Sequence, residues 1–223
     1  MSVALQAPTE TPALLDDLPT LLDPAAEAAR QLVELVREGV WQRVAGDGKP
    51  DAALMEREQH AAHGFAWLTT YEQTLAELAR HASSASAEGR FGELEALLAQ
   101  IAFGEYLHQM VGGIPMSQTE VFRPTDLGFR AADIDACLNP QARRLMTLGN
   151  TPAARERLAE LMIEREGAAT FGDSGLDETM EAMRDEMRRF TEAEVVPYAH
   201  EWHLQNAYIP METISQMSEL GVF

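Results

Sequence analysis

Hydrophobic positions follow a helical spacing along the chain from Ala25 onward. The first series recurs every fourth residue, at Leu32, Val36, Val40 and Val44. It ends at the polar stretch "GDGKP", whose glycines and proline are typical of a turn. The pattern therefore predicts a first amphipathic helix that stops at this stretch.

Two longer hydrophobic series follow, separated by the polar stretch "SSASAEG". The second series starts near Asp51 and alternates spacings of three and four at Ala61, Phe65, Leu68, Tyr71, Leu75 and Leu78. The third starts at about Arg90, ends at Gly112-Gly113, and has one face made of Phe91, Leu94, Leu98 and Ile101. Two long amphipathic helices joined by a short polar turn predict an antiparallel helical hairpin.

Shorter helical segments are expected in the rest of the chain, at 130–138, 140–148 and 152–166. The stretch "GAATFGDSG" has three glycines and no periodic apolar residue, which favours a linker at 167–175. A further helical series then runs through Leu176, Met180, Met183, Met187 and Phe190. No segment alternates like a strand, so the sequence predicts an all-α protein.

These boundaries divide the chain into four parts. Residues 1–24 are rich in proline and threonine and are expected to be a flexible lead, in which "LLDDLPTLL" docks only loosely. Residues 25–166 are expected to form a helical extension domain, which the linker at 167–175 joins to a second, incomplete helical domain at 176–223.

The charge of the chain restricts its partners. Lys and Arg total 17 against 36 Asp and Glu, a net charge of -19, which disfavours nucleic acids and anionic membrane surfaces. Cys137 is the only cysteine, so an internal disulfide and a cysteine-rich metal site are excluded, and we expect a small residue on a helix face. The N-terminal stretch lacks the pattern of a signal or transit peptide, and we expect a cytoplasmic protein without membrane association.

Glu105 and His108 form a Glu-x-x-His pair that prolongs the apolar stripe of the third helix, so both side chains are expected to point inward. In a helical bundle this is half of a di-iron carboxylate site. No second Glu-x-x-His occurs, so we assign no metal ligand, although a di-iron bundle stays open as a third hypothesis.

Other residues with possible chemistry have simpler interpretations. His60 and His63 share a helix face without a third ligand, which favours hydrogen-bonded interfacial residues over a metal site. The tryptophans, Trp41, Trp67 and Trp202, are expected to be core or interface anchors. The methionines of the last series, Met180, Met183 and Met187, are interpreted first as core residues, and a binding face is the second choice. No P-loop, dinucleotide fingerprint or nucleophile elbow occurs.

The last residues, "ISQMSELGVF", pose a separate question. Ile214, Met217 and Leu220 are spaced as on a helix, and Gly221 stands where a left-handed residue commonly ends one. Two apolar residues, Val222 and Phe223, follow this glycine. The expectation from this pattern is that the chain is cut, or stops early, within a domain.

The stretch "MRRFTEAEVVPYAHEWHLQNAYIPMETISQMSELGVF" resembles the opening of the acyl-CoA dehydrogenase family. The matching positions are Phe190, Val195, Pro197, Ala199, Trp202, Ile209-Pro210, Met217, Glu219-Leu220-Gly221 and Val222-Phe223. His203 departs from the family, which commonly carries Asp there. The resemblance implies that these residues begin the N-terminal α-domain of such an enzyme.

The preceding region is similar to a helical extension that the methylsuccinyl-CoA dehydrogenase subgroup carries ahead of the ordinary body. The similar stretches are "LMEREQHAAHGFAWLTTYEQTL" and "GRFGELEALLAQIAFGEYLHQMVGGIPMSQTEVFRPTDLG". Within the second, Gln109-Met-Val-Gly112-Gly113 also resembles a Gln-x-x-Gly-Gly phrase of the family's C-terminal helical domain, near FAD. The extension is therefore either a decayed copy of that domain or a helical region whose Gly-Gly-Ile-Pro simply ends a helix.

The resemblance implies a flavoenzyme that transfers the α-proton of an acyl-CoA to a glutamate and the β-hydride to FAD, and then passes electrons to an electron-transfer flavoprotein. The implied substrate is a short branched acyl-CoA such as methylsuccinyl-CoA, in the ethylmalonyl-CoA pathway, and the complete enzyme is expected to be a homo-oligomer. The family's catalytic glutamate and flavin site belong to later domains. No residue of this chain, neither Glu105 nor Glu120, is therefore assigned to catalysis or cofactor binding, and the chain alone is expected to hold no FAD. The alternative is a stand-alone acidic helical module that binds partner helices through its methionine-rich face.

Overall fold

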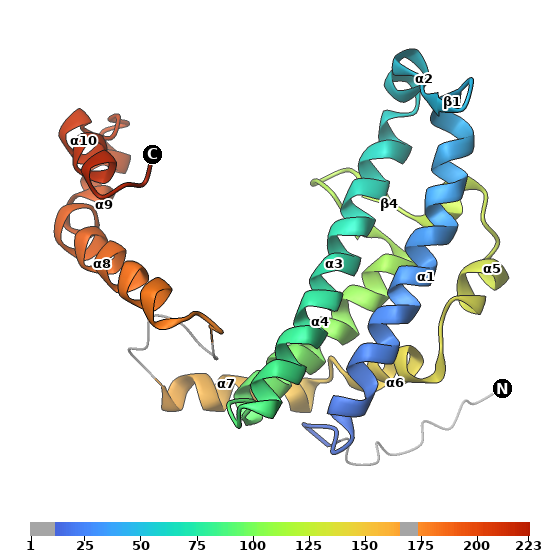
Figure 1. The fold of residues 1–223 in the computed structure, drawn as a ribbon, viewed down its shortest axis with the longest axis horizontal. Coiled ribbons are helices and arrows are strands. Elements are labelled where there is room, and N and C mark those ends of the chain that lie inside the picture. Colours follow the sequence, from blue (N-terminus) through green and yellow to red (C-terminus); the bar gives the residue numbers. More distant parts are fainter. Residues whose placement is uncertain (1–11, 166–173) are drawn as a thin grey trace, which may run out of the picture. The chain divides into compact units, whose positions relative to one another are not determined.

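The fold is all-α, as predicted (Figure 1). The computed structural model describes residues 12–165 and 174–223, and these contain ten α-helices, one 3-10 helix and four strands of two residues each. The chain divides into two compact units, residues 1–173 (unit 1) and residues 174–223 (unit 2). Among the described helices, none is both long and apolar enough to cross a membrane.

Unit 1 is built around three long helices, α1 (Leu18–Val44), α3 (Gln59–Ala87) and α4 (Glu93–Gly112), which pack side by side (Figure 1). The predicted antiparallel hairpin of the second and third helices is confirmed by α3 and α4. The shorter elements are α2 (Ala52–Arg57), η1 (Pro124–Leu127), α5 (Ala131–Ala136), α6 (Pro140–Leu148) and α7 (Pro152–Glu164).

The helix expected from Asp51 begins there but is divided in two. The Asp51 carboxylate accepts a hydrogen bond from the Leu54 amide, the typical N-cap contact, and so starts α2. The chain then leaves helical geometry at Glu58 before α3 continues. Two short strand pairs were not predicted: β1 (Ala45–Gly46) with β2 (Lys49–Pro50), and β3 (Ile114–Pro115) with β4 (Val121–Phe122). Two-residue strands are too short to leave an alternating sequence pattern.

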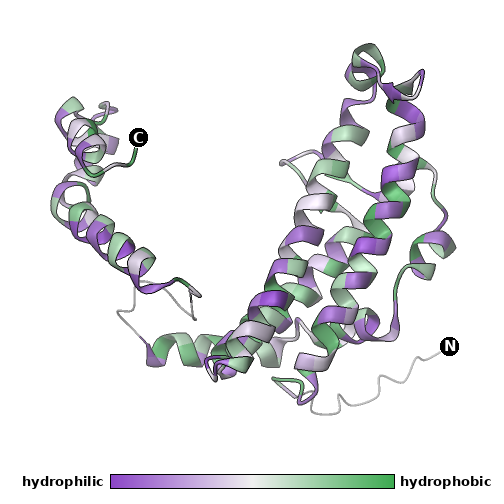
Figure 2. Ribbon diagram, in the orientation of Figure 1, coloured by the Kyte–Doolittle hydropathy of each residue, from purple (hydrophilic) through white to green (hydrophobic). Residues whose placement is uncertain are grey.

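The core of unit 1 lies between the three long helices. Helices α1 and α3 carry hydrophobic residues on one side and hydrophilic residues on another (Figure 2). The largest side chains that are almost inaccessible to solvent are Leu18, Leu32, Leu68, Leu75, Phe103, Leu107, Met110, Ile114, Phe122 and Leu145. A second, smaller cluster joins α4 to α7 through Leu94, Leu97, Ala154 and Leu161.

The two clusters correct the prediction of a single buried face on the third helix. Leu94, Leu98 and Ile101 pack in the cluster with α7, whereas Phe103 and Leu107 pack in the main core. Helix α4 is thus covered on two sides. The three-and-four spacing identified only the stripe that α7 covers.

The predicted flexible lead at 1–24 is wrong for its second half. Helix α1 starts at Leu18, not at Ala25, because Pro19 stands in its first turn, where a missing amide hydrogen costs nothing. Leu15, Leu18 and Leu22 are buried in the main core. Residues 1–11 lie outside the described part of the chain, as does most of the predicted linker at 167–175.

Unit 2 consists of α8 (Glu178–Glu194), α9 (Val196–Leu204) and α10 (Met211–Glu219). Pro197 separates α8 from α9, because it lacks an amide hydrogen and its ring would clash with the preceding turn. Gly221 is left-handed (φ 79°), and the Val222 amide donates to the Met217 carbonyl oxygen over 3.1 Å. This is the geometry of a Schellman C-cap, so the predicted helix end at Gly221 is confirmed.

Candidate functional site

Glu105 and His108 do not converge on a common point. The carboxylate of Glu105 accepts hydrogen bonds from the side-chain amides of Gln109 (2.7 Å) and Asn150 (2.6 Å). His108 is exposed, and its Nε2 lies 2.7 Å from the backbone oxygen of Met146. The inward orientation expected for both side chains is therefore wrong. The residues of α4 that point into the main core are Phe103 and Leu107 instead.

The histidines of α3 take part in separate contacts. His60 has Nδ1 3.3 Å from a carboxylate oxygen of Glu120 and lies beside the ring of Phe122. His63 accepts a hydrogen bond of 3.0 Å from the indole nitrogen of Trp67. Each histidine has one ring nitrogen in a polar contact, as predicted, but only the contact of His60 joins two elements, because Trp67 lies on the same helix as His63. Within residues 12–165 and 174–223, no three His, Cys, Asp or Glu side chains are grouped closely enough to hold a metal ion.

Gln109 and the glycines that follow it serve the packing of unit 1. The Gln109 side chain accepts a hydrogen bond of 2.9 Å from the Tyr71 hydroxyl and thereby links α3 to α4. Tyr71 also stacks on Tyr106, with ring centroids 4.6 Å apart. Gly113 ends α4 with φ 142°, a conformation that side chains disfavour. The phrase therefore ends a helix, a geometry that both interpretations of it share.

Cys137 follows α5 and is half-buried, with its thiol 3.5 Å from the backbone oxygen of Asp133. Burial raises the pKa of the Cys137 thiol, and the nearby Asp133 carboxylate adds to this effect. Reactive cysteines have a lowered pKa instead. The interpretation of Cys137 as a packing residue agrees with this direction.

Two buried polar side chains of unit 1 were missed by the sequence analysis. Gln100 is fully buried and accepts a hydrogen bond from the Leu15 amide (2.8 Å), while its own amide donates to the Ala13 oxygen (2.9 Å). Glu72 is buried on the core side of α3 and accepts a hydrogen bond of 2.7 Å from Gln73. Glu72 continues the three-and-four spacing between Leu68 and Leu75, and that spacing was the signal that could have found it.

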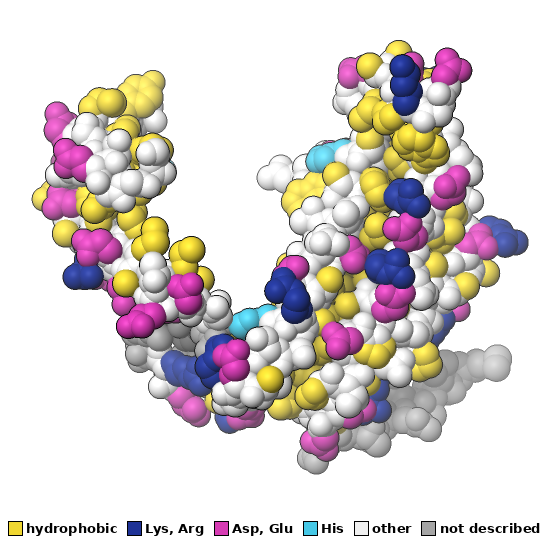
Figure 3. Space-filling view, viewed as in Figure 1, with side chains coloured by type: hydrophobic (Ala, Val, Ile, Leu, Met, Phe, Trp, Pro, Cys, Tyr) yellow, Lys and Arg dark blue, Asp and Glu magenta, His cyan; other side chains and the backbone are white. Residues whose placement is uncertain are grey.

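Most of the exposed large hydrophobic side chains in the described part of the chain belong to unit 2. Twelve large hydrophobic side chains are exposed there, namely Leu176, Met180, Met183, Val196, Tyr198, Leu204, Tyr208, Ile209, Met211, Leu220, Val222 and Phe223. Many of them are visible at the surface of unit 2 in Figure 3. The interpretation of Met180 and Met183 as core residues is therefore wrong within this unit. Exposed apolar surface of this extent is typical of a site that another segment or protein covers.

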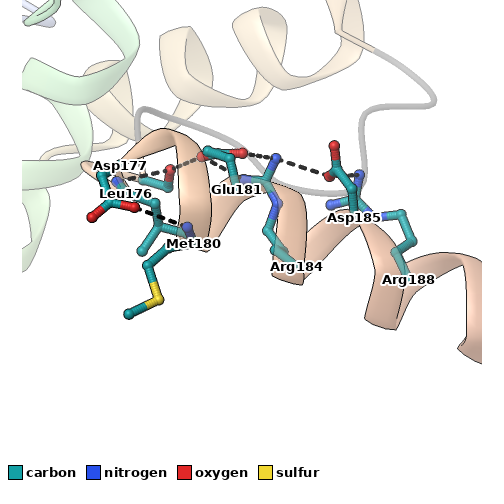
Figure 4. A network of polar contacts seen from close by, with 8 residues as sticks. Leu176, Asp177, Met180, Glu181, Arg184, Asp185 and Arg188 are labelled. Carbon is teal, nitrogen blue, oxygen red and sulfur yellow. Dashed lines mark hydrogen bonds and ion pairs between the residues drawn. The ribbon is translucent and has the colours of Figure 1, made fainter. Parts of the chain in front are cut away.

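Polar side chains at the start of α8 form hydrogen bonds and ion pairs with one another and with the helix backbone (Figure 4). Asp177 caps the helix by accepting a hydrogen bond of 2.9 Å from the Met180 amide. Glu181 accepts from the Ser174 hydroxyl (2.6 Å) and pairs with Arg184 one turn later. These polar side chains at the start of α8 are therefore held by contacts within the helix and with the residues just before it.

The tryptophans differ in their environment. Trp67 packs against the main core of unit 1, as predicted. Trp202 is half-buried and stacks on Tyr198, with ring centroids 6.0 Å apart. Trp41 is exposed and is not part of the core.

Two comparisons with known proteins show what unit 2 and the chain as a whole are similar to. Residues 177–223 match the model of the acyl-CoA dehydrogenase N-terminal domain. Over 210 residues, 94% of its length, the chain is 48% identical to (2S)-methylsuccinyl-CoA dehydrogenase from Cereibacter sphaeroides. The chain spans 38% of the length of that relative. Both findings show that the chain is similar to acyl-CoA dehydrogenases, and they fit a partial N-terminal region of such a protein.

Proposed function

We propose that this chain is the N-terminal part of a FAD-dependent acyl-CoA dehydrogenase that oxidises a short branched acyl-CoA such as methylsuccinyl-CoA at its α,β-bond. The observation that carries the proposal is the 48% identity to a (2S)-methylsuccinyl-CoA dehydrogenase, because it extends over 94% of this chain. The match of residues 177–223 to the family's N-terminal domain supports it independently.

The proposed division of labour follows the two units. The helices of unit 1, from α1 at Leu18 to α7, serve as the helical extension domain, joined to unit 2 by the linker at 167–175. Residues 176–223 serve as the first helices of the N-terminal domain of the enzyme. The apolar surface of unit 2 then packs against later parts of the same protein, which removes it from water.

The described side chains of unit 2 do not fit a flavin site. Among them only Thr213 is buried, so they do not enclose an isoalloxazine ring. In the complete enzyme FAD would accept the hydride from the acyl-CoA. We assign no residue of this chain to FAD or to proton abstraction and derive no step from them.

The complete enzyme is further proposed to be a homo-oligomer that works in the cytoplasm and passes its electrons to an electron-transfer flavoprotein. The net charge of -19 supports a soluble, non-nucleic-acid-binding protein in this role. These partners are proposed from the family and not from a surface of this chain.

The proposal is tested by comparing two purified proteins, the complete gene product and the 223-residue chain. We expect the complete protein to be yellow, to contain about one FAD per subunit, and to reduce a dye when methylsuccinyl-CoA is added. The 223-residue chain is expected to be colourless and inactive. A complete protein without flavin, or one that does not act on acyl-CoA thioesters, would contradict the proposal.

The alternative, a stand-alone helical interaction module, rests on the same exposed apolar residues of unit 2. It predicts that the native polypeptide in its source cell has the mass of this chain, 24.6 kDa. Intact-mass measurement separates the two functions, because the proposed enzyme requires a mass more than twice as large.

A further inference from the structure

We propose that Lys49 is a modification site, whose ε-amine is acylated by dicarboxylic acyl-CoA thioesters of the succinyl type. The inference rests on the proposed function, because an enzyme that oxidises methylsuccinyl-CoA works in a solution of such a thioester. Its test is independent of catalysis, since the acylation requires neither flavin nor an active site.

Lys49 is the single lysine of the chain. Of the 17 basic side chains, the other 16 are arginines. A guanidinium keeps its proton and presents no free electron pair, whereas the amine of lysine can lose its proton and then attack a carbonyl carbon. A stable side-chain amide can therefore form at one basic residue of this chain, Lys49.

The β1–β2 hairpin holds the backbone of Lys49 and leaves its side chain free. The hairpin lies at one end of the long helices of unit 1, beside α2 (Figure 1). Lys49 pairs with Gly46 across it, and the turn residues Asp47 (φ 51°) and Gly48 (φ 75°) are both left-handed, as in a tight two-residue turn. Lys49 is exposed, and its side chain has no hydrogen bond or ion pair with the described residues. Its amine is therefore available to a reagent from solution.

The acyl donor activates itself. In a succinyl-type thioester the free carboxylate attacks the thioester carbonyl of the same molecule through a five-membered ring. The C–S bond breaks, and CoA leaves as a thiolate that takes up a proton. Intramolecular attack in a favourable geometry has an effective molarity of about 10⁵ M or more. The product is a cyclic anhydride, which is a stronger electrophile than the thioester.

The Lys49 amine completes the transfer. The neutral Nζ attacks one anhydride carbonyl, the ring C–O bond breaks, and the amine proton passes to water, so that an amide and a free carboxylate result. No oxidant or reductant is consumed. The charge of the side chain changes from positive to negative, and the net charge of the chain, -19, falls by two.

The acidity of the chain separates the anhydride from its parent thioester. With a net charge of -19 the protein repels the phosphates of CoA. Asp47 and Asp51, two residues before and after Lys49, add to this repulsion locally. The cyclic anhydride carries no charge and is not repelled. The site is therefore selective for acyl groups that can cyclise, and a simple thioester such as acetyl-CoA is a poor donor.

The test is peptide mass spectrometry of the complete protein after incubation with succinyl-CoA at mildly alkaline pH. Trypsin does not cleave before Pro50, so Lys49 stays within the peptide 44–57 before and after acylation. We expect this peptide to gain one succinyl group, at least about tenfold faster than it gains an acetyl group from acetyl-CoA. The guanidinium-unfolded protein is the reference and should react at about the same rate. Lys49→Arg is the control and should leave the peptide unmodified.

Three results would overturn the inference. A peptide 44–57 that is modified only in the unfolded protein would mean that Lys49 is covered. Equal rates with succinyl-CoA and acetyl-CoA would mean that cyclisation does not supply the reactive group. Acylation of the same peptide in the Lys49→Arg variant would mean that another side chain accepts it. Flavin content and dye reduction are measured on the same complete protein, so that failure of the proposed enzyme function is seen separately from failure of the acylation site.

Discussion

The helices of the two units share the same hydrophobic spacing, but they differ in how many of their large apolar side chains are exposed to solvent. Of the fifteen large hydrophobic side chains that are exposed among the described residues, three belong to unit 1 and twelve to unit 2. Unit 2 accounts for only residues 174–223. Amphipathic spacing thus predicts a helix in both units, but it does not predict whether a neighbouring element is present to cover the apolar side.

The difference has a thermodynamic consequence. Short helices are marginal in water, and most of their stability in proteins comes from packing of the apolar side. In unit 1 this packing is complete within the unit, through the main core and the smaller cluster of α4 and α7. Unit 1 is therefore expected to fold cooperatively, and unit 2 to be the less stable part of the isolated chain.

The largest expected effect separates the two units directly. Phe103 is fully buried in the main core of unit 1, and Phe103→Ala is expected to lower the free energy of unfolding by about 3–5 kcal/mol. The measurement is urea denaturation followed by circular dichroism and by tryptophan fluorescence. The matched control is Phe223→Ala in unit 2, which removes the same ring from a position that is 78% exposed. A control as destabilising as Phe103→Ala would contradict the comparison of the units.

Gln100→Leu is expected to have the next largest effect, because it keeps the volume but removes the hydrogen bonds that hold the N-terminal segment. The Leu15 amide would be left buried without its acceptor, at a cost of about 1–3 kcal/mol, and the carbonyl oxygens of Ala13 and Gly149 would lose a donor. Hydrogen exchange at Leu15 should rise more than exchange in the centre of α3. Gln42→Leu on the exposed side of α1 is the control and should change neither quantity.

Gly64→Ala tests the fit between α3 and the β3–β4 pair. A Cβ atom at Gly64 would overlap the ring of Phe122, which is fully buried and has no room to move. Overpacking of this kind costs about 1–3 kcal/mol. Gly112→Ala, where a Cβ meets nothing within 4 Å, is the control and should be neutral or slightly stabilising. Equal thermal unfolding midpoints for the two variants would show that the Phe122 ring relocates freely.

Much of unit 1 could be predicted because its helices obey one spacing and end at strong signals. The break at "GDGKP", the hairpin of α3 and α4, and the end at Gly112-Gly113 were all predicted from such signals. The start of α1 was missed because the prolines of this stretch suggested a lead. Pro19 is tolerated because it stands in the first turn, whereas Pro24 lies inside the helix. The second buried side of α4 was missed because a helix covered on two sides has no single apolar stripe.

The candidate site could be predicted only as far as the resemblance reached. The four-residue relation of His63 to Trp67 gave a local contact, but the partners of Glu105 and His108 depend on Asn150 and Met146, which are about 40 residues away in the sequence. The spacing of Met180, Met183, Met187 and Phe190 identified α8 correctly, although Leu176 lies before the helix. Whether the apolar side of α8 is covered depends on segments outside these residues, and that information is absent from the local pattern.

The smallest expected effect concerns the ion pair that fastens α7 to α4. Arg157 donates hydrogen bonds of 2.8 and 2.9 Å to the two carboxylate oxygens of Glu93, and these bonds lower the pKa of the Glu93 carboxyl below its ordinary value. A carboxyl whose pKa is lower in the folded than in the unfolded state stabilises the fold above its ordinary pKa. This contribution is lost as the pH falls through the lowered value.

Arg157→Gln should therefore lower the midpoint of thermal unfolding slightly at pH 7, and the difference from the unaltered chain should shrink toward zero as the pH falls from about 6 to about 3. Arg80→Gln is the control, because Arg80 pairs with Glu77 of the same helix, and this ion pair does not join two helices. Since Arg157 belongs to unit 1, its substitution should not change the unfolding of unit 2. The fluorescence of Trp202 should therefore follow the same curve in the Arg157 variant and in the unaltered chain. A difference that grows toward low pH would mean that Arg157 stabilises unit 1 by some route other than Glu93.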